Sequence, residues 1–152
     1  MTGEIDLGPM LATLTVTRRP GAYVFIAIPA DHDQPSARGV EAMLVEAEGV
    51  TVVATVEAAE ANGWSHDGRW AWLSLDVHSS LEAVGLTAAF ATALAGDDLP
   101  CNVLAGYHHD HLLVPIDRAD DAIACLDRLR ERHSRLPAPE TGGDETRDPP
   151  DQ

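Results

Sequence analysis

Lysine is absent from this chain of 152 residues, and all ten of its basic residues are arginine. Against 25 Asp and Glu residues they leave a formal net charge of −15 at pH 7. A nucleic-acid-binding protein needs a concentrated basic face to meet phosphates. The arginines cluster only over residues 128–135, at a helix end where positive charge is favoured anyway. We therefore expect no nucleic acid partner.

Cysteine is also scarce, because Cys101 and Cys125 are the only two. Two such residues make no convincing disulfide framework, so we expect buried free thiols, which fit a reducing compartment. No apolar run is long enough for a bilayer, since the weakly polar run over residues 83–96 is short and rich in alanine. The acidic N-terminus lacks the order of a signal peptide. We expect a cytoplasmic protein without a membrane partner.

The motifs of the common enzyme classes are missing as well. The sequence has no G-x-S-x-G elbow, no P-loop and no dinucleotide-binding glycine pattern. Ser79 or Ser80 beside His78 does not indicate a catalytic triad, because adjacent residues rarely point at each other. Cys101 has no basic neighbour in sequence to activate it. We expect no enzyme, no catalytic residues and no cofactor.

The N-terminal half alternates strand and helix patterns. Period-two alternation and β-branched runs predict strands, and helices are expected to stop at Gly49 and Gly63. The predicted strands cover residues 11–17, 23–28 and 50–56, and the predicted short helices cover residues 40–48 and 57–62.

The C-terminal half has clearer boundaries. Residues 70–77 alternate as a strand with one apolar face, and its Trp70 and Trp72 would cover the junction between halves or a subunit interface. Ser79 and Glu82 form a capping box, which predicts a helix to about residue 95 with Gly96 as its stop, and Val84 on its apolar face. Strands over residues 102–107 and 112–116 should form an antiparallel hairpin. A last helix follows from residue 117.

This organisation predicts four segments. Residues 1–10 would be an N-terminal tail, residues 11–68 and 69–136 two halves, and residues 137–152 a disordered tail rich in proline, glycine and acid. The βαββα order of the second half predicts an α+β fold with a ferredoxin-like antiparallel sheet and helices on one face.

Five short strings extend this reading to a family. They are VHSSLEAVGLTAA at residues 77–89, CNV at 101–103, YHHDHLLVP at 107–115, GAYVF at 21–25 and EAEGV at 46–50. Together they resemble a bacterial family of stand-alone ACT-domain proteins, whose ACT modules bind small molecules and regulate. The resemblance implies two ACT-like halves in tandem. A full ACT domain is βαββαβ, so we expect the N-terminal half to supply the strand that the C-terminal half lacks.

The first candidate site is the loop and helix start at His78, Ser79, Ser80, Leu81 and Gly85. Free N–H groups and the helix dipole attract a carboxylate there, and glycine permits close approach. Simple capping with close helix-sheet packing explains the same residues. In ACT regulators, amino acids typically bind near this loop, where two modules meet, so the resemblance implies a ligand site.

Asn102 and Asp110 complete the candidate site. ACT modules often offer polar groups near the position of Asn102, although asparagine at a strand start is equally ordinary turn chemistry. Asp110, or in its place Asp76 or backbone carbonyls, would accept the ammonium of an amino acid. Asp110 belongs to the turn at residues 108–111, where His108, His109 and His111 with Asp110 have the chemistry of transition-metal ligands. No second cluster completes a metal site, so we expect a polar turn and no metal.

The leading hypothesis is a non-catalytic regulatory protein that binds an amino acid at the junction of its modules. We expect a homodimer that acts through an unidentified protein partner by favouring one arrangement of modules. One alternative is a ligand-free dimerisation or interaction module, because open sheets have edges that pair readily. The other is a metal-binding protein that uses the histidines of residues 108–111.

Overall fold

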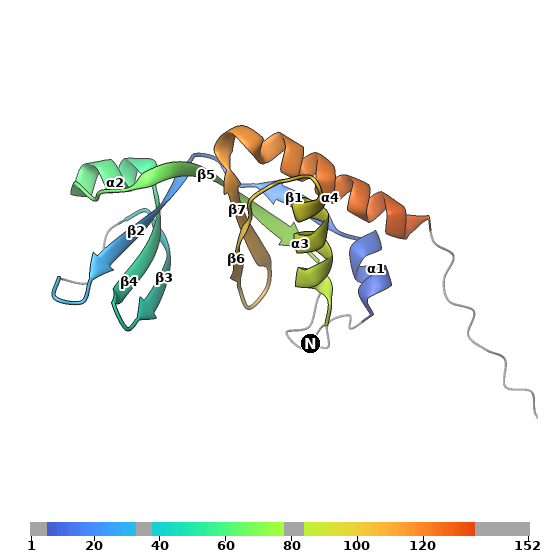
Figure 1. The fold of residues 1–152 in the computed structure, drawn as a ribbon, viewed down its shortest axis with the longest axis horizontal. Helices are drawn as coiled ribbons and strands as arrows, with labels where there is room; N and C mark the ends of the chain where they lie inside the picture. Colours follow the sequence, from blue (N-terminus) through green and yellow to red (C-terminus); the bar gives the residue numbers. More distant parts are fainter. Residues whose placement is uncertain (1–5, 33–37, 78–83, 136–152) are drawn as a thin grey trace, which may run out of the picture.

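The computed structural model describes residues 6–32, 38–77 and 84–135. Its strands form one seven-stranded sheet with the path β3-β4-β2-β5-β7-β6, and β1 pairs with β5 beside that path (Figure 1). Every pairing is antiparallel. In chain order the elements are α1 (Leu7–Ala12), β1 (Thr15–Arg18), β2 (Tyr23–Pro29), β3 (Val40–Glu46), β4 (Gly49–Thr55), α2 (Val56–Asn62), β5 (Asp67–Asp76), α3 (Leu86–Gly96), β6 (Asn102–Ala105), β7 (Asp110–Pro115), the 3-10 turn η1 (Ile116–Arg118) and α4 (Ala119–Ser134). The predicted α+β class is confirmed.

The long strand β5 belongs to two four-stranded units. Near its start β5 pairs with β2, through Phe25 opposite Asp67 and Tyr23 opposite Trp70. Farther along, the same edge pairs with β1, while the other edge pairs with β7. The strand orders are therefore β5-β2-β4-β3 in the first unit and β1-β5-β7-β6 in the second. The fourth strand of the second unit, β1, thus comes from the N-terminal half.

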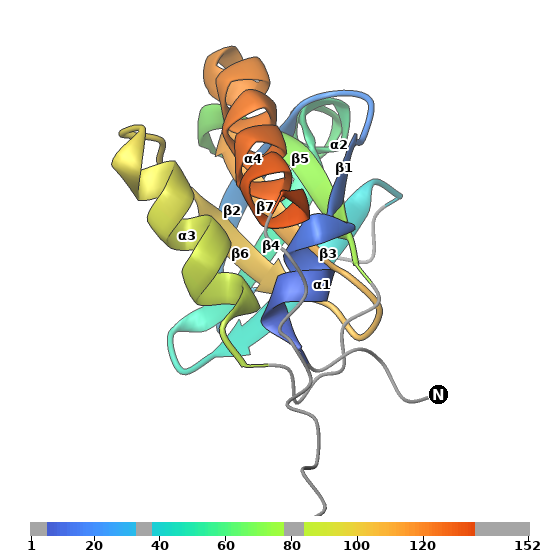
Figure 2. The same cartoon turned by 90° about the vertical axis from the view of Figure 1, so that its right-hand side faces the viewer.

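Helices α1, α3 and α4 cover one face of the second unit (Figure 2). Alternate residues of β5 face them, because successive side chains of a strand point to opposite faces. Each fully buried leucine or phenylalanine contributes about 1.5–3 kcal/mol through removal of apolar surface from water. The largest side chains of this core are Met10, Leu11, Leu14, Leu73, Leu75, Phe90, Leu94, Leu112 and Leu126. This core fixes the position of α3 against the end of β5.

Helix α2 covers the matching face of the first unit. Thr55 caps it by accepting a hydrogen bond from the Ala58 N–H at 3.2 Å, and Gly63 ends it in the left-handed conformation. Its apolar side packs on β2 and β4, where Val24 and Val52 are fully buried.

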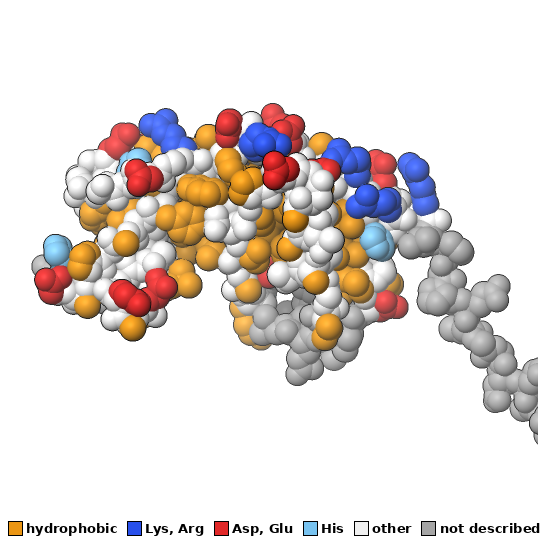
Figure 3. All heavy atoms as spheres, viewed as in Figure 1, with side chains coloured by type: hydrophobic (Ala, Val, Ile, Leu, Met, Phe, Trp, Pro, Cys, Tyr) orange, Lys and Arg blue, Asp and Glu red, His pale blue; other side chains and the backbone are white. Residues whose placement is uncertain are grey.

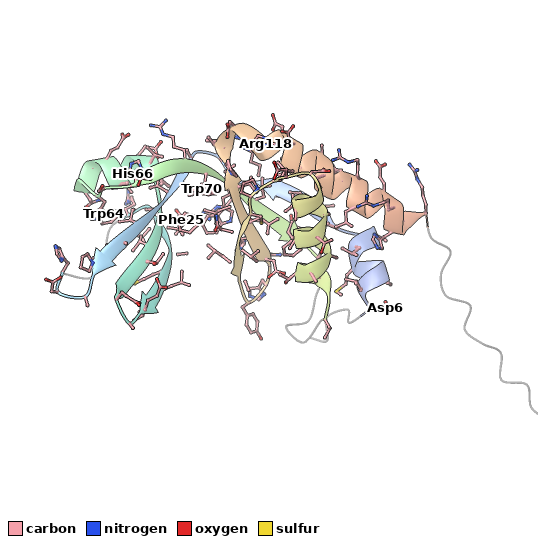
Figure 4. The ribbon with its side chains drawn as sticks, viewed as in Figure 1. Asp6, Phe25, Trp64, His66, Trp70 and Arg118 are labelled. Atoms are coloured by element: carbon pink, nitrogen blue, oxygen red, sulfur yellow. The ribbon has the colours of Figure 1, made fainter. Side chains whose placement is uncertain are left out.

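The faces that no described helix covers meet each other where the sheet bends at β5. Tyr23 and Val53 of the first unit pack there against Trp72 and Leu113 of the second. The rings of Tyr23 and Trp72 lie 5.3 Å apart. Beside them Phe25 and Trp70 stack edge to face at 5.6 Å, side by side in Figure 4. The tryptophans therefore pack at the junction of the halves, one of the two places expected for them.

An ion pair extends this contact between the two units. The Arg19 guanidinium lies 4.6 Å from the Trp72 ring centroid and 2.7 Å from the Glu41 carboxylate. A guanidinium over an indole face is a favourable cation–π arrangement. Arg19 thus links β3 to the strand pair β1–β5.

Three sequence predictions are wrong. Residues 40–48 form strand β3 and a turn instead of a helix, because pairing with β4 outweighs their helical spacing. Residues 7–12 form α1 in place of a tail and the first part of a strand, since Asp6 accepts a hydrogen bond from the Gly8 N–H at 3.2 Å. Helix α3 begins at Leu86, after the predicted capping box, and Val84 is 81% exposed.

The other predicted elements are confirmed within a few residues, including the end of α3 at Gly96 and the hairpin of β6 and β7. The expected boundary at residue 68 falls inside β5, and the division into domains stays a prediction. Among the described residues, no helix is long and apolar enough to cross a membrane.

Candidate ligand site at the end of β5

The predicted site residues fall into two groups. His78, Ser79, Ser80 and Leu81 lie outside the described residues. Gly85, Asn102 and Asp110 lie within them. The described part of the site is the end of β5, the start of β7 beside it, and the start of α3.

Gly85 is the N-cap of α3. Its φ of +98° is left-handed, which side-chain-bearing residues rarely adopt. A Cβ at this position would lie 3.1 Å from Leu7 Cδ2 in α1. Backbone conformation and close packing on α1 therefore both require glycine here.

The N-terminus of α3 has no side-chain cap among the described residues. An α-helix begins with N–H groups that have no partner inside the helix. These groups and the helix dipole favour an anion at this end. The start of α3 is thus chemically suited to a carboxylate.

Asp110 begins β7, directly opposite Leu75 near the end of β5. It shares its sheet face with Leu75 and Leu112, which are both buried under the helices. Burial raises the pKa of the Asp110 carboxyl, and the positive charge of His111 opposes this in part. Among the described residues, none forms a hydrogen bond or ion pair with its carboxylate.

Asn102 does not come together with Asp110. It pairs with Leu113, three residues along the ladder from the pair of Ala105 and Asp110. Three residues along a strand span about 10 Å, and an odd number of steps reverses the face. Asn102 therefore lies at the far end of β6 and on the opposite face of the sheet.

His109 and His111 lie on that opposite face too, with Asp76, the alternative acceptor for the ammonium, and with Thr17 and Ser74, which sequence reasoning missed. His109 Nδ1 is 3.6 Å from an Asp76 oxygen, and Thr17 donates a 2.7 Å hydrogen bond to Asp76. His111 Nδ1 and Ser74 Oγ lie 3.0 Å apart. The alternation of side chains along β1 and β5 could have placed these partners on this face. Thr17 lies two residues from Arg19, and Ser74 and Asp76 lie two and four residues from Trp72. Arg19 and Trp72 mark the face because the guanidinium lies over the indole ring.

The surroundings of His111 shift the pKa of its ring. Burial lowers its pKa first, and the nearby positive charges of His109 and Arg19 act in the same direction. Its ring also packs 5.2 Å from the Trp72 ring. Within the described ranges, no three His, Cys, Asp or Glu residues are placed to hold a metal ion.

Family models match both halves of the chain. A model described as ACT domain matches residues 2–71, and a second ACT domain model matches residues 65–128. Their overlap includes the start of β5, the strand that the two units share. No curated protein matches the chain.

Solved structures share this fold. A Vibrio cholerae protein of unknown function is 33% identical, with a TM-score of 0.69 over 82% of this chain and 95% of that chain. An Agrobacterium tumefaciens protein is 15% identical, with a TM-score of 0.66 over 77% of this chain and 89% of that one. The regulatory subunit of aspartate kinase from Thermus flavus is 13% identical, with a TM-score of 0.52 over 76% and 95%. With ACT domain models matching both halves, this chain belongs to the ACT-domain family and carries two ACT-type units in tandem.

Proposed function

We propose that this protein is a non-catalytic regulator that binds a small amino acid beside the start of α3. The family membership and the aspartate kinase regulatory subunits with the same fold support a regulatory, ligand-binding role. The observation that carries the choice of ligand is Asp110, a partly buried carboxylate without a described partner. Asp110, the first residue of β7, lies opposite Leu75 near the end of β5, and α3 is the next helix along the chain after β5.

The two charges of an amino acid suit the two ends of this site. The ligand carboxylate would meet the uncapped N–H groups of α3 and the predicted loop at residues 78–81. The ligand ammonium would meet Asp110, and a hydrogen bond between charged groups contributes about 1.5–3 kcal/mol. Because burial disfavours the ionised form of Asp110, an arriving ammonium would offset that penalty. Binding then regulates by favouring one arrangement of modules.

Substitution of Asp110 tests the site. In a thermal-shift screen of the common amino acids, we expect one or a few to raise the Tm of the wild type by several degrees. Asp110→Asn should lose most of this rise, because the ammonium then lacks its counter-charge. Asp120→Asn is the matched control, since that carboxylate is exposed at the start of α4.

Two results would contradict the proposal. One is that no amino acid stabilises the wild type. The other is that Asp110→Asn responds to the same amino acid as strongly as the wild type and the Asp120→Asn control.

We further propose that two copies pair through β6 and α3. Among the described strands, only β7 pairs with β6, so its other edge is free. Neither β6 nor α3 contains a charged residue, in a chain whose net charge is −15. The outer face of α3 exposes small side chains, and Val103 of β6 is 37% exposed. A two-fold axis would therefore bring these surfaces together without opposing like charges.

Light scattering coupled to size exclusion tests the dimer. Ala88 is exposed on α3, so Ala88→Glu should fold normally yet convert the dimer to a monomer by placing two carboxylates in the interface. Ala61→Glu, on the exposed side of α2, is the control and should remain dimeric. A wild-type monomer would refute the dimer. A dimer that ignores every amino acid would favour the ligand-free interaction module instead.

A further inference from the structure

Strand β3 ends the sheet opposite to β6. Only β4 pairs with it among the described strands, so one edge of β3 has unpaired N–H and C=O groups. Proteins usually protect such an edge with lysine, proline or a covering element. Residues 40–46 contain neither lysine nor proline. Instead Met43, Leu44 and Val45 are 42%, 44% and 79% exposed.

A small cavity lies at the tip of the β3–β4 hairpin, over the end of β2 and the start of β4. Its volume is about 150 Å³, and Ile28, Pro29 and Val50 contribute apolar walls. Glu46 and Glu48 line it as well, and Glu46 accepts a hydrogen bond from the Thr51 hydroxyl. Figure 3 shows acidic side chains beside apolar ones at the lower left tip, whereas the blue arginines lie along the upper side of the molecule, most of them at its right over α4. The cavity has room for one side chain with an apolar stem and a cationic head.

We propose that the free edge of β3 binds an extended basic segment of a partner protein. The segment would add a strand to the sheet, with backbone hydrogen bonds along residues 40–46. On one face its apolar side chains would lie beside Met43 and Val45, and on the other face its basic side chains would lie beside Leu44 and Glu46. A lysine or arginine of the segment would enter the cavity and meet Glu46 and Glu48.

The charges argue against an occupant from this chain. Residues 40–48 carry Glu41, Glu46 and Glu48, and a second copy would bring the same three carboxylates to this edge. Like charges brought together disfavour such a pairing, whereas a basic segment complements them. The chain has no lysine, and residues 136–152 contain five acidic residues against one arginine. The basic segment therefore comes from another protein. This inference does not depend on the ligand or the dimer proposed above.

A peptide in which valine and arginine alternate is a suitable probe. We expect a fluorescein-labelled peptide of this kind to bind the full chain by polarisation. Glu46→Gln with Glu48→Gln should weaken binding about threefold to tenfold, as expected for two partly exposed ion pairs. Val45→Lys should weaken it as well, because the new charge repels the peptide, and this exposed position tolerates lysine. Hydrogen exchange should show new protection over residues 40–46 and none over β6.

Matched controls separate a specific site from general attraction to an acidic protein. Glu57→Gln with Glu60→Gln removes the same charge from α2 and should leave peptide binding unchanged. Equal losses in the two double variants, or protection outside β3, would overturn the proposal. So would a wild-type assembly that Val45→Lys dissociates, because a second copy would then occupy the edge.

Discussion

At the scale of single residues, the proposed role of Asp110 in binding would come at a cost to folding. An acid whose pKa is raised in the folded state contributes stability below its unfolded pKa, and that stability is lost as pH rises through the folded value. The ionised form of Asp110 therefore costs stability, and a cationic ligand would offset that cost. Sequence reasoning found this residue from the chemistry of carboxylates. It could not know that Asn102 lies on the other face, because that depends on the register of β6 against β7.

Gly85 carries a prediction at the same scale. We expect Gly85→Ala to lower the free energy of unfolding by about 1–3 kcal/mol, because alanine is strained at positive φ and its Cβ would approach Leu7. Urea unfolding monitored by circular dichroism measures the change. Gly96→Ala is the control, since no atom lies within 4 Å of its Cβ position, and it should be neutral or slightly stabilising. Equal effects of the two substitutions would contradict this account.

At the scale of elements, the sequence predicts correctly the helix ends that depend on neighbouring residues. The end of α2 was predicted from Gly63 and the end of α3 from Gly96, because helix breakers act within a few residues. The cap that Thr55 provides for α2 was missed. Strand β3 does not follow in this way. Residues 40–48 have helix-compatible spacing, and only their ladder with β4 makes them a strand.

The start of α3 was mispredicted for a related reason. The capping box at Ser79 and Glu82 is a valid local signal, but Gly85 adopts a left-handed conformation that excludes a helix running through it. A Cβ at this position would also approach Leu7, which lies far away in sequence. Helix α1 was missed because Gly8 and Pro9 in its first turn obscure its pattern, although Asp6 is a good N-cap.

At the scale of the whole molecule, the two ACT-type units cannot be separated cleanly. They share β5, the second unit takes β1 from the N-terminal half, and Tyr23 and Val53 pack against Trp72 and Leu113 across the bend. Removing either half would expose one of these surfaces to water. A regulator built in this way would pass a change at the end of β5 directly to the first unit, since both units contain the same strand.

This shared construction predicts a single cooperative unfolding transition. Trp70 and Trp72 report on the junction by fluorescence, whereas circular dichroism in the far ultraviolet reports on all elements, so the two urea curves should coincide. Trp72→Ala should shift both curves together by about 3–5 kcal/mol, because Trp72 is only 3% exposed and its loss leaves a cavity between the units. Leu44→Ala, at a 44% exposed position on β3, should shift them far less.

Limited proteolysis should release no folded fragment of residues 70–133, because that fragment lacks β1. Two separate transitions, or a stable fragment of this kind, would show that the units fold independently.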